Sequence, residues 1–251
     1  LWHNSANRLN MLQSQTDEFV CLKVYSAAAL SDGRQDLDKL YRDMDDADAF
    51  LFQVTSSDSA WIEIEEYAEK FETPMIYVGG ESAGKIKTKD QMKHSAICNQ
   101  FYVYSGAENM VNMMKYICSQ VLHEEMDYQE PIFIPWEGIF HPDSKEIFQS
   151  TKDYFAWKEP SGKGTIALLV SRTAWLSGDI EVERALIKHI EKNGYTALPI
   201  FSYAMADIDL GAKGTAYAIE TFCFDGYGQP IVDGVIRMTG FFLQDTDEYA
   251  N

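Results

Sequence analysis

Residues 164–203 read GTIALLVSRTAWLSGDIEVERALIKHIEKNGYTALPIFSY, and this stretch decides the fold class. Residues 165–171 and 196–203 are almost continuously apolar over the length of a strand, which is typical of buried strands. The segment between them carries apolar residues at helical spacing, acidic residues in its first turn, and Gly194 as the predicted C-cap. A strand, a helix and a strand joined by short connections predict a parallel sheet covered by helices.

The first half of the chain repeats this rhythm. Residues 20–25, 49–54 and 75–80 are predicted strands. The apolar spacing between the first and second of these strands, and between the second and third, predicts one helix in each interval. Residues 4–12 are amphipathic and predict a helix before the first strand, while residues 108–122 predict a long helix after the third. The two helical stripes comprise Leu37, Leu40, Tyr41 and Met44, and Trp61, Ile64, Ala68 and Phe71.

Residues 124–163 interrupt the pattern with four of the chain's seven prolines and many aromatic side chains. Prolines impose extended or turn geometry, and disordered linkers are poor in aromatic residues, so we expect an ordered connector. The predicted fold is α/β, with two doubly wound parallel-sheet (flavodoxin/Rossmann-like) subdomains, residues 1–123 and 164–251, joined by this Pro- and aromatic-rich connector. Residues 232–242 supply a third strand to the second subdomain, which we expect to be the truncated start of a larger domain.

The charge balance is strongly acidic. Lys and Arg number 21 against 39 Asp and Glu, so the formal net charge is −18 and the pI is about 4.6. Such a chain repels nucleic-acid phosphates and anionic membrane surfaces, and no apolar run approaches the roughly 18 residues that span a bilayer. Four cysteines without a C-x-x-C pair favour a reducing compartment over a disulfide framework or a zinc site. We therefore expect a cytoplasmic protein with no nucleic-acid partner and no membrane insertion.

Two loops follow predicted strands, at the position where doubly wound sheets meet ligands. Gly79 and Gly80 form one of them, where a plain turn with positive φ is the simpler interpretation and a ligand site the alternative. Residues 55–59 offer hydroxyl groups at the start of a helix; N-capping explains one or two of them and leaves a ligand open for the rest. The sequence contains no standard phosphate-binding, zinc-protease or nucleophile-elbow motif.

His141 is the most suggestive of the five histidines. It lies in the turn WEGIFHPD, residues 136–143, with the carboxyl groups of Glu137 and Asp143 within four residues. Imidazole and carboxylate together bind a divalent metal or relay protons, whereas a histidine that hydrogen-bonds its own connector is the alternative that composition favours. The other four histidines are expected to be solvated: His3, His94, His123 and His189.

Arg172 and Trp175 lie in the segment that joins the strand 165–171 to the following helix. An arginine and a tryptophan at the carboxyl end of a strand can hold a flat anionic ligand by ion pairing and stacking. A surface arginine packed on an aromatic ring is an equally good interpretation.

Several motifs occur in the order found in one protein family. The chain resembles the large subunit of the class I tetrapyrrole chelatases, which comprise the cobaltochelatase large subunit and the magnesium chelatase H subunit. The His-Pro-Asp turn, and the later strand that is followed by an arginine, a tryptophan and a glycine, are closer to the cobaltochelatase branch. The chain departs from the family pattern before Glu108, where a pair of glycines is expected and Gly106 is followed by Ala107. The matching stretches are residues 104–110, 131–143, 154–157, 164–194, 198–201, 232–236 and 239–241.

The resemblance implies a subunit that holds a tetrapyrrole while a two-component AAA+ ATPase drives insertion of the metal ion. The reaction removes two pyrrolic protons and desolvates the ion, so it needs a base and a metal-handling ligand near the macrocycle. ATP is then used by the partner subunits, and Co2+ or Mg2+ is the substrate ion. Candidates for metal and proton handling are Glu137, His141 and Asp143, with His141 as the metal ligand, and candidates for tetrapyrrole binding are Arg172, Trp175 and Trp136.

The leading functional hypothesis is an N-terminal fragment of the large subunit of an ATP-dependent cobaltochelatase, which inserts Co2+ into a corrin precursor in cobalamin biosynthesis. The parent complex would be a ligase that forms nitrogen–metal bonds, and the isolated fragment would be inactive. A magnesium chelatase H subunit, binding a porphyrin in the chlorophyll pathway, is the alternative within the family. A non-catalytic α/β module that binds a small ligand or a protein is the alternative outside it.

Overall fold

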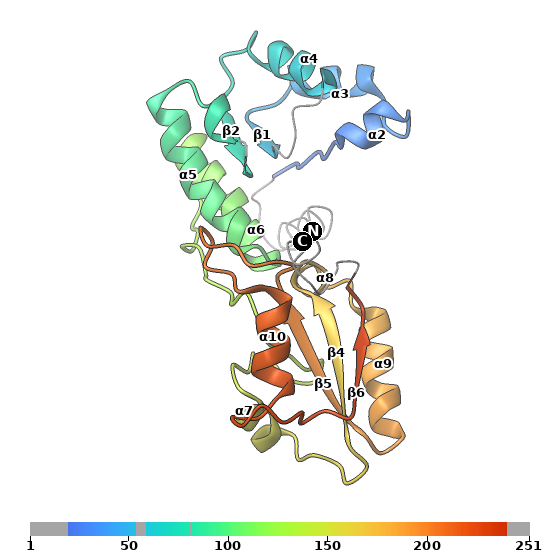
Figure 1. Ribbon diagram of the computed structural model, residues 1–251. Coiled ribbons are helices and arrows are strands. Elements are labelled where there is room, and N and C mark those ends of the chain that lie inside the picture. The colour runs from blue at the N-terminus through green and yellow to red at the C-terminus, as the bar shows by residue number, and fades with distance from the viewer. Residues whose placement is uncertain (1–19, 54–58, 81, 240–251) are drawn as a thin grey trace, which may run out of the picture. The chain divides into compact units, whose positions relative to one another are not determined.

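The computed structural model describes residues 20–53, 59–80 and 82–239, and the chain divides into two compact units, residues 1–134 and 135–251 (Figure 1). Both units combine helices with parallel strands, which confirms the α/β class. The predicted connector falls across the division, and its residues from Pro135 onward belong to the second unit. None of the helices in the described part of the chain is long and apolar enough to cross a membrane.

The first unit is built around two parallel strands. Strand β1 (Phe50–Gln53) pairs with β2 (Met75–Val78) in the register Phe50 to Met75, and both strands lie where the sequence predicts them. The two expected helices between residues 37 and 71 are also confirmed as α3 and α4. Helical elements of this unit are α2 (Ala27–Ser31), α3 (Leu37–Asp45), α4 (Ser59–Ala68), the 3-10 turn η1 (Ser82–Lys85), α5 (Lys89–Tyr104), α6 (Ala107–Tyr116) and the π-helical turn η2 (Ile117–Val121).

The prediction of a strand at residues 20–25 is wrong. No strand is assigned to residues 20–25, and the carbonyl of Val24 accepts a hydrogen bond of 3.0 Å from the side chain of Gln35. The Gln35 side chain also accepts a hydrogen bond of 2.7 Å from the amide of Ser26. The backbone at Val24 and Ser26 therefore bonds to a glutamine side chain. The helix predicted at residues 4–12 lies outside the described residues.

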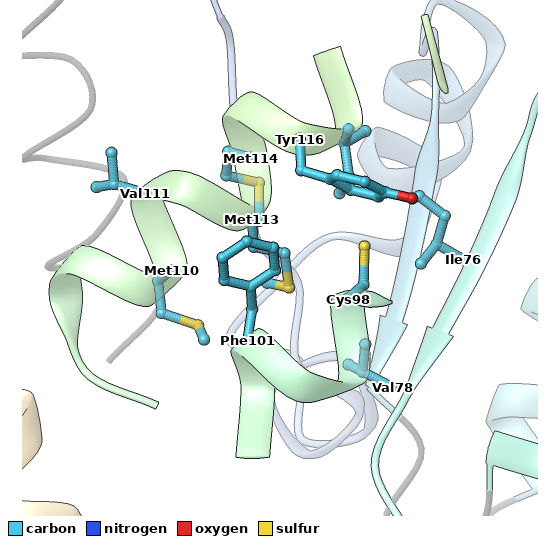
Figure 2. Packing of buried hydrophobic residues seen from close by; sticks show 10 residues of the cluster. Ile76, Val78, Cys98, Phe101, Met110, Val111, Met113, Met114 and Tyr116 are labelled. Carbon is cyan, nitrogen blue, oxygen red and sulfur yellow. The ribbon is translucent and has the colours of Figure 1, made fainter. Parts of the chain in front are cut away.

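Helix α5 was not expected from the sequence, although it is 16 residues long. Its beginning carries a capping box, in which Thr88 accepts from the amide of Gln91 and the Gln91 side chain reaches back to the amide of Thr88. The helix packs against β2 and α6 and shares one apolar core with them (Figure 2). That core includes Ile76, Val78, Cys98, Phe101, Met110, Met113 and Tyr116.

Helix α6 is buried on nearly all sides, so two asparagines on it hydrogen-bond to backbone rather than to water. Asn109 accepts from the amide of Ile132 at 2.9 Å and donates to its carbonyl at 2.8 Å. Asn112 accepts from the amide of Gln129, also at 2.9 Å. The extended chain at residues 129–132 is therefore held along α6 by the buried side-chain amides of Asn109 and Asn112, whose polar groups find partners in its backbone.

His94 corrects a second expectation, because it is half-buried rather than solvated. Its Nδ1 lies 2.9 Å from the hydroxyl of Tyr116 in the core between α5 and α6. Burial, with Lys93 nearby, lowers the pKa of His94 below its usual value near 6.5, and burial raises the pKa of Tyr116 to about 12. The neutral imidazole is therefore the form that the folded unit accommodates.

This pKa shift predicts a pH dependence of stability. The unfolded chain binds a proton at His94 below about pH 6.5 while the folded chain resists it, so the contribution of His94 is lost as the pH falls from there toward the lower folded pKa. Thermal melts at pH 7.5 and 5.5 should show a larger loss of stability for the wild type than for His94→Gln, which keeps a neutral hydrogen-bonding group. Equal losses in both proteins would contradict this assignment.

The second unit has a four-stranded sheet in the order β3-β5-β4-β6, and Figure 1 labels its strands β5, β4 and β6. Strand β4 is parallel to both β5 and β6, and the two-residue β3 runs antiparallel along β5. The predicted strands and the helix within residues 164–203 are confirmed, whereas three further helices were not expected. The elements are β3 (Gly138–Ile139), α7 (Thr151–Trp157), β4 (Thr165–Ser171), α8 (Arg172–Ser177), α9 (Glu181–Lys192), β5 (Thr196–Ser202), α10 (Gly214–Cys223) and β6 (Gly234–Arg237).

Helices cover both faces of this sheet, which explains why β4 is apolar from Ile166 to Val170. Ala167 and Leu169 point into a core shared with α7 and α10, and Leu168 and Val170 point into a core shared with α9. All four side chains are buried. A doubly wound, flavodoxin/Rossmann-like order for the two units remains a prediction. The predicted strand at residues 232–242 is shorter than expected, and its last three residues lie outside the described part.

Candidate functional site

The candidate site lies at the carboxyl edge of the second sheet, where β4 ends at Ser171 and β5 ends at Ser202. Ligands of open α/β sheets bind outside the carboxyl ends of the strands, so this edge is the first place to look for chemistry. Three of the residues selected from the sequence meet here: Trp136, Glu137 and Arg172.

Arg172 begins α8 and is buried, with an exposed fraction of 4%. Its guanidinium lies 4.3 Å from the ring centroid of Trp136, and its Nε donates to the carbonyl of Pro135 at 2.9 Å. Burial lowers the pKa of Arg172 to about 10, while the negative charge of Glu137 acts in the opposite direction. Arg172 is thus still charged at neutral pH, and it packs on an aromatic ring inside the protein rather than at its surface.

Trp136 anchors the connector to the end of β5. Its carbonyl accepts from the amide of Tyr203 at 3.1 Å, and the two rings make an edge contact with centroids 5.4 Å apart. Trp175 does not join this cluster. It stacks on Phe201, with centroids 3.9 Å apart and planes 11° apart, and contributes to the core beneath α9. The structure therefore pairs Arg172 with Trp136 and gives Trp175 a packing partner of its own.

Glu137 holds the start of α10. Its Oε1 accepts from the backbone amides of Lys213 at 2.9 Å and Gly214 at 2.7 Å, and the side chain is buried. A carboxylate at the N-terminal end of a helix is favoured by the helix dipole and by the free amides there. Glu137 consequently occupies the place at which an external anion would bind in many α/β proteins.

Gly214 makes this contact possible. Its φ is +81°, and a Cβ atom at this position would lie 2.7 Å from the backbone nitrogen of Ala206. Nothing in the local sequence around Glu137 indicates these partners, because they come from a loop 76 and 77 residues further along the chain.

His141 lies on the other side of β3, away from Glu137. Strand β3 pairs Gly138 with Phe201 and Ile139 with Ile200, so His141 lies nearer the amino end of β5. Its Nδ1 accepts from the amide of Asp143 at 3.2 Å, and its Nε2 lies 3.0 Å from Oε1 of Glu191 on α9. Because the amide of Asp143 donates to Nδ1, Nε2 is the ring nitrogen that faces Glu191, and Nζ of Lys158 lies 3.3 Å from it.

The surroundings of His141 complete a closed network. Lys158 pairs with the same Glu191 oxygen at 2.5 Å, and the ring of Trp157 lies 5.0 Å from the imidazole. The Asp143 carboxylate is 70% exposed and stands 3.8 Å from Nδ1. Both ring nitrogens of His141 are therefore occupied by the protein itself.

The three candidates for metal and proton handling are not gathered at one point. Across residues 20–53, 59–80 and 82–239, no group of three or more His, Cys, Asp or Glu side chains is arranged to hold a metal ion. A role for Glu137, His141 and Asp143 toward a metal ion remains a prediction. The contacts described above show that Glu137 binds the start of α10 and that His141 binds Glu191 on α9.

The His141 network makes a direct prediction. His141→Ala removes a buried ring and leaves Glu191 and Lys158 without their central partner, so it should lower the free energy of unfolding by about 3 kcal/mol. Urea denaturation of the wild type and the variant, followed by circular dichroism, measures this loss. An unchanged free energy of unfolding in His141→Ala would contradict a structural role for this network.

Of the two loops selected beside the first sheet, only one is described. Gly79 has φ +103°, and its amide donates 2.9 Å to the side chain of Asn99 on α5. The turn therefore uses the conformation that glycine favours and has an internal partner. In the loop 55–59, residues 55–58 lie outside the described part.

The described geometry defines a layered α/β unit, residues 135–251, in which Glu137 and Arg172 are buried by contacts within the same unit. Residues 99–251 match the family model CobN/Magnesium Chelatase, so the chain belongs to the CobN/magnesium chelatase family. This result confirms the resemblance noted in the sequence at the level of the family.

Three relatives illustrate the match. The uncharacterized protein MJ1441 of Methanocaldococcus jannaschii is 26% identical over 85% of this chain and 16% of its own length. The magnesium-chelatase subunit ChlH, chloroplastic, of Oryza sativa subsp. indica is 24% identical over 57% of this chain and 11% of its own. The catalytic subunit of cobaltochelatase from Mycobacterium tuberculosis shares the fold, with a TM-score of 0.54 and 16% identity over 82% of this chain and 16% of that one. The chain thus spans about a sixth or less of these relatives.

Proposed function

We propose that this chain is the N-terminal portion of the large subunit of an ATP-dependent metal chelatase, and that the parent subunit binds a tetrapyrrole. The observation that carries the proposal is the match of residues 99–251 to the CobN/Magnesium Chelatase model. ATP would be hydrolysed by AAA+ partner subunits, and the complex would work in the cytoplasm as a ligase that forms nitrogen–metal bonds.

We propose Co2+ as the substrate ion and a corrin precursor in cobalamin biosynthesis as the macrocycle. The likeness of the fold to a cobaltochelatase catalytic subunit supports this choice, together with the His-Pro-Asp turn. The similarity to magnesium-chelatase subunits favours the second candidate, Mg2+ and a porphyrin.

The role of the described residues follows from their burial. Arg172, Trp136 and Glu137 are occupied by contacts within the second unit, so they would shape the carboxyl edge from inside rather than touch the macrocycle. Trp175, which is half-buried on Phe201, would support the same edge. The chain alone is therefore expected to be inactive, and it would serve the parent subunit as a preformed support.

Metal insertion by the parent subunit tests the proposal. The purified parent subunit, its ATPase partners and ATP are mixed with a corrin precursor or a porphyrin, and the absorption spectrum is followed after Co2+ or Mg2+ is added. ATP-dependent insertion of Co2+ into the corrin precursor supports the proposal. Insertion of Mg2+ into the porphyrin supports the second candidate, and failure of both ions with both macrocycles refutes the enzymatic assignment.

A further inference from the structure

The loop between β5 and α10, residues 203–213, presents an apolar tip to solvent. Ile208 is 96% exposed and Met205 is 66% exposed, the two highest values among the large aliphatic side chains described for the second unit. Loops at the carboxyl ends of parallel strands often carry binding residues in α/β proteins, and this loop follows the carboxyl end of β5.

Hydrogen bonds within the loop order its backbone. Asp207 and Ala212 exchange two backbone hydrogen bonds, of 2.8 and 3.0 Å, as a short antiparallel bridge. Within this bridge, Oδ1 of Asp207 accepts from the amide of Leu210 at 3.0 Å, and the amide of Gly211 donates to the carbonyl of Ile208 at 3.2 Å. Ile208 is therefore held at the end of a closed turn.

The base of the loop is fixed to the core. Glu137 binds the amides that close it, and the Thr215 hydroxyl lies 2.8 Å from that of Ser202 and 3.1 Å from the carbonyl of Tyr203. A contact made by a preformed loop loses little conformational entropy on binding. The hydrogen bonds thus fix the backbone that carries Ile208, and its side chain stays exposed although burying it would be favourable.

The charges beside the tip describe its partner. Asp207 and Asp209 flank Ile208 in a chain of net charge −18, so a complementary surface carries lysine or arginine around an apolar socket. A second copy of this chain and a carboxylate-rich macrocycle would both be repelled. Permanent interfaces are depleted in charge at their centre, whereas an apolar tip between two carboxylates suits a contact that forms and dissociates.

We propose that this loop is a docking tip for a separate protein, whose surface offers an apolar socket rimmed by basic residues, and that this protein is a partner subunit of the chelatase. The inference rests on the proposed function, since that function supplies the partner subunits. Ile208 fills the socket, and Asp209 pairs with its basic rim.

The test uses the parent large subunit and its purified ATPase partner subunits. Ile208→Asp, Asp209→Lys and the matched control Tyr227→Asp are compared with the wild type, because Tyr227 is 92% exposed on a different loop. Ile208→Asp should raise the Kd for the partner subunits at least tenfold, about 1.4 kcal/mol, since it places an unpaired carboxylate in an apolar socket. Asp209→Lys should weaken binding in the same direction, and Tyr227→Asp should leave the Kd within about twofold of the wild type.

Binding of a corrin precursor and of a porphyrin is measured in parallel on the same four proteins. Unchanged tetrapyrrole binding with weakened partner binding in Ile208→Asp supports the inference. A Kd for the partner subunits that stays within twofold in Ile208→Asp overturns it while leaving the proposed function intact. Loss of tetrapyrrole binding in that variant also overturns it, and a wild type that binds neither partner nor tetrapyrrole refutes both.

Discussion

Gly164→Ala is expected to lower the free energy of unfolding of the chain by about 4 kcal/mol or more. Gly164 has φ +127°, a conformation that alanine adopts only under strain, and a Cβ there would lie 2.4 Å from Oδ2 of Asp233. Asp233 cannot simply move away. Its Oδ2 accepts from the amide of Thr165 at 2.7 Å, and its own amide donates to the Thr165 carbonyl at 2.8 Å.

The chain provides a matched control two residues earlier. A Cβ at Gly162 would meet nothing within 4 Å, so Gly162→Ala should change the free energy of unfolding by less than about 1 kcal/mol. Urea denaturation followed by circular dichroism compares the two variants with the wild type. Similar losses in both would mean that the contact between Gly164 and Asp233 does not control how β6 joins β4.

The elements that the sequence predicts correctly are those with one clear period. Strands β4 and β5 are apolar on both faces, and α9 shows one apolar face, acids at its start and Gly194 after its end, at φ +82°. Helix α5 packs against β2 on one side and α6 on another, so its apolar residues follow no single stripe. The capping box at Thr88 and Gln91 is the local signal that could have revealed it.

The contacts of the candidate residues could be predicted from the sequence only in part. The proximity of Arg172 to a tryptophan was foreseeable in kind, yet the ring beneath it belongs to Trp136 in the connector and not to the nearby Trp175. His141 and Glu137 are neighbours in sequence, but the intervening β3 directs them to different partners. Those partners, Glu191 and the start of α10, are far along the chain, and no local pattern encodes such pairings.

Glu137→Ala is the second large effect that we expect, a loss of about 3 kcal/mol of unfolding free energy. The variant leaves the amides of Lys213 and Gly214 without their acceptor at the start of α10. It also removes the negative charge that favours the buried guanidinium of Arg172. Circular dichroism melts would record the loss.

Glu137→Gln separates the hydrogen bonds from the charge. Its amide oxygen still accepts from the two backbone groups, so it should recover about half of the loss, and the remainder measures the contribution of the charge. Asp143→Ala is the matched control, because that carboxylate is 70% exposed and should contribute less than about 0.5 kcal/mol.

Formate added to Glu137→Ala should raise its melting temperature more than that of the wild type, since the vacated place at the helix start favours a small anion. If Glu137→Ala were as stable as Asp143→Ala, Glu137 would not be what holds the loop of residues 203–213 in place.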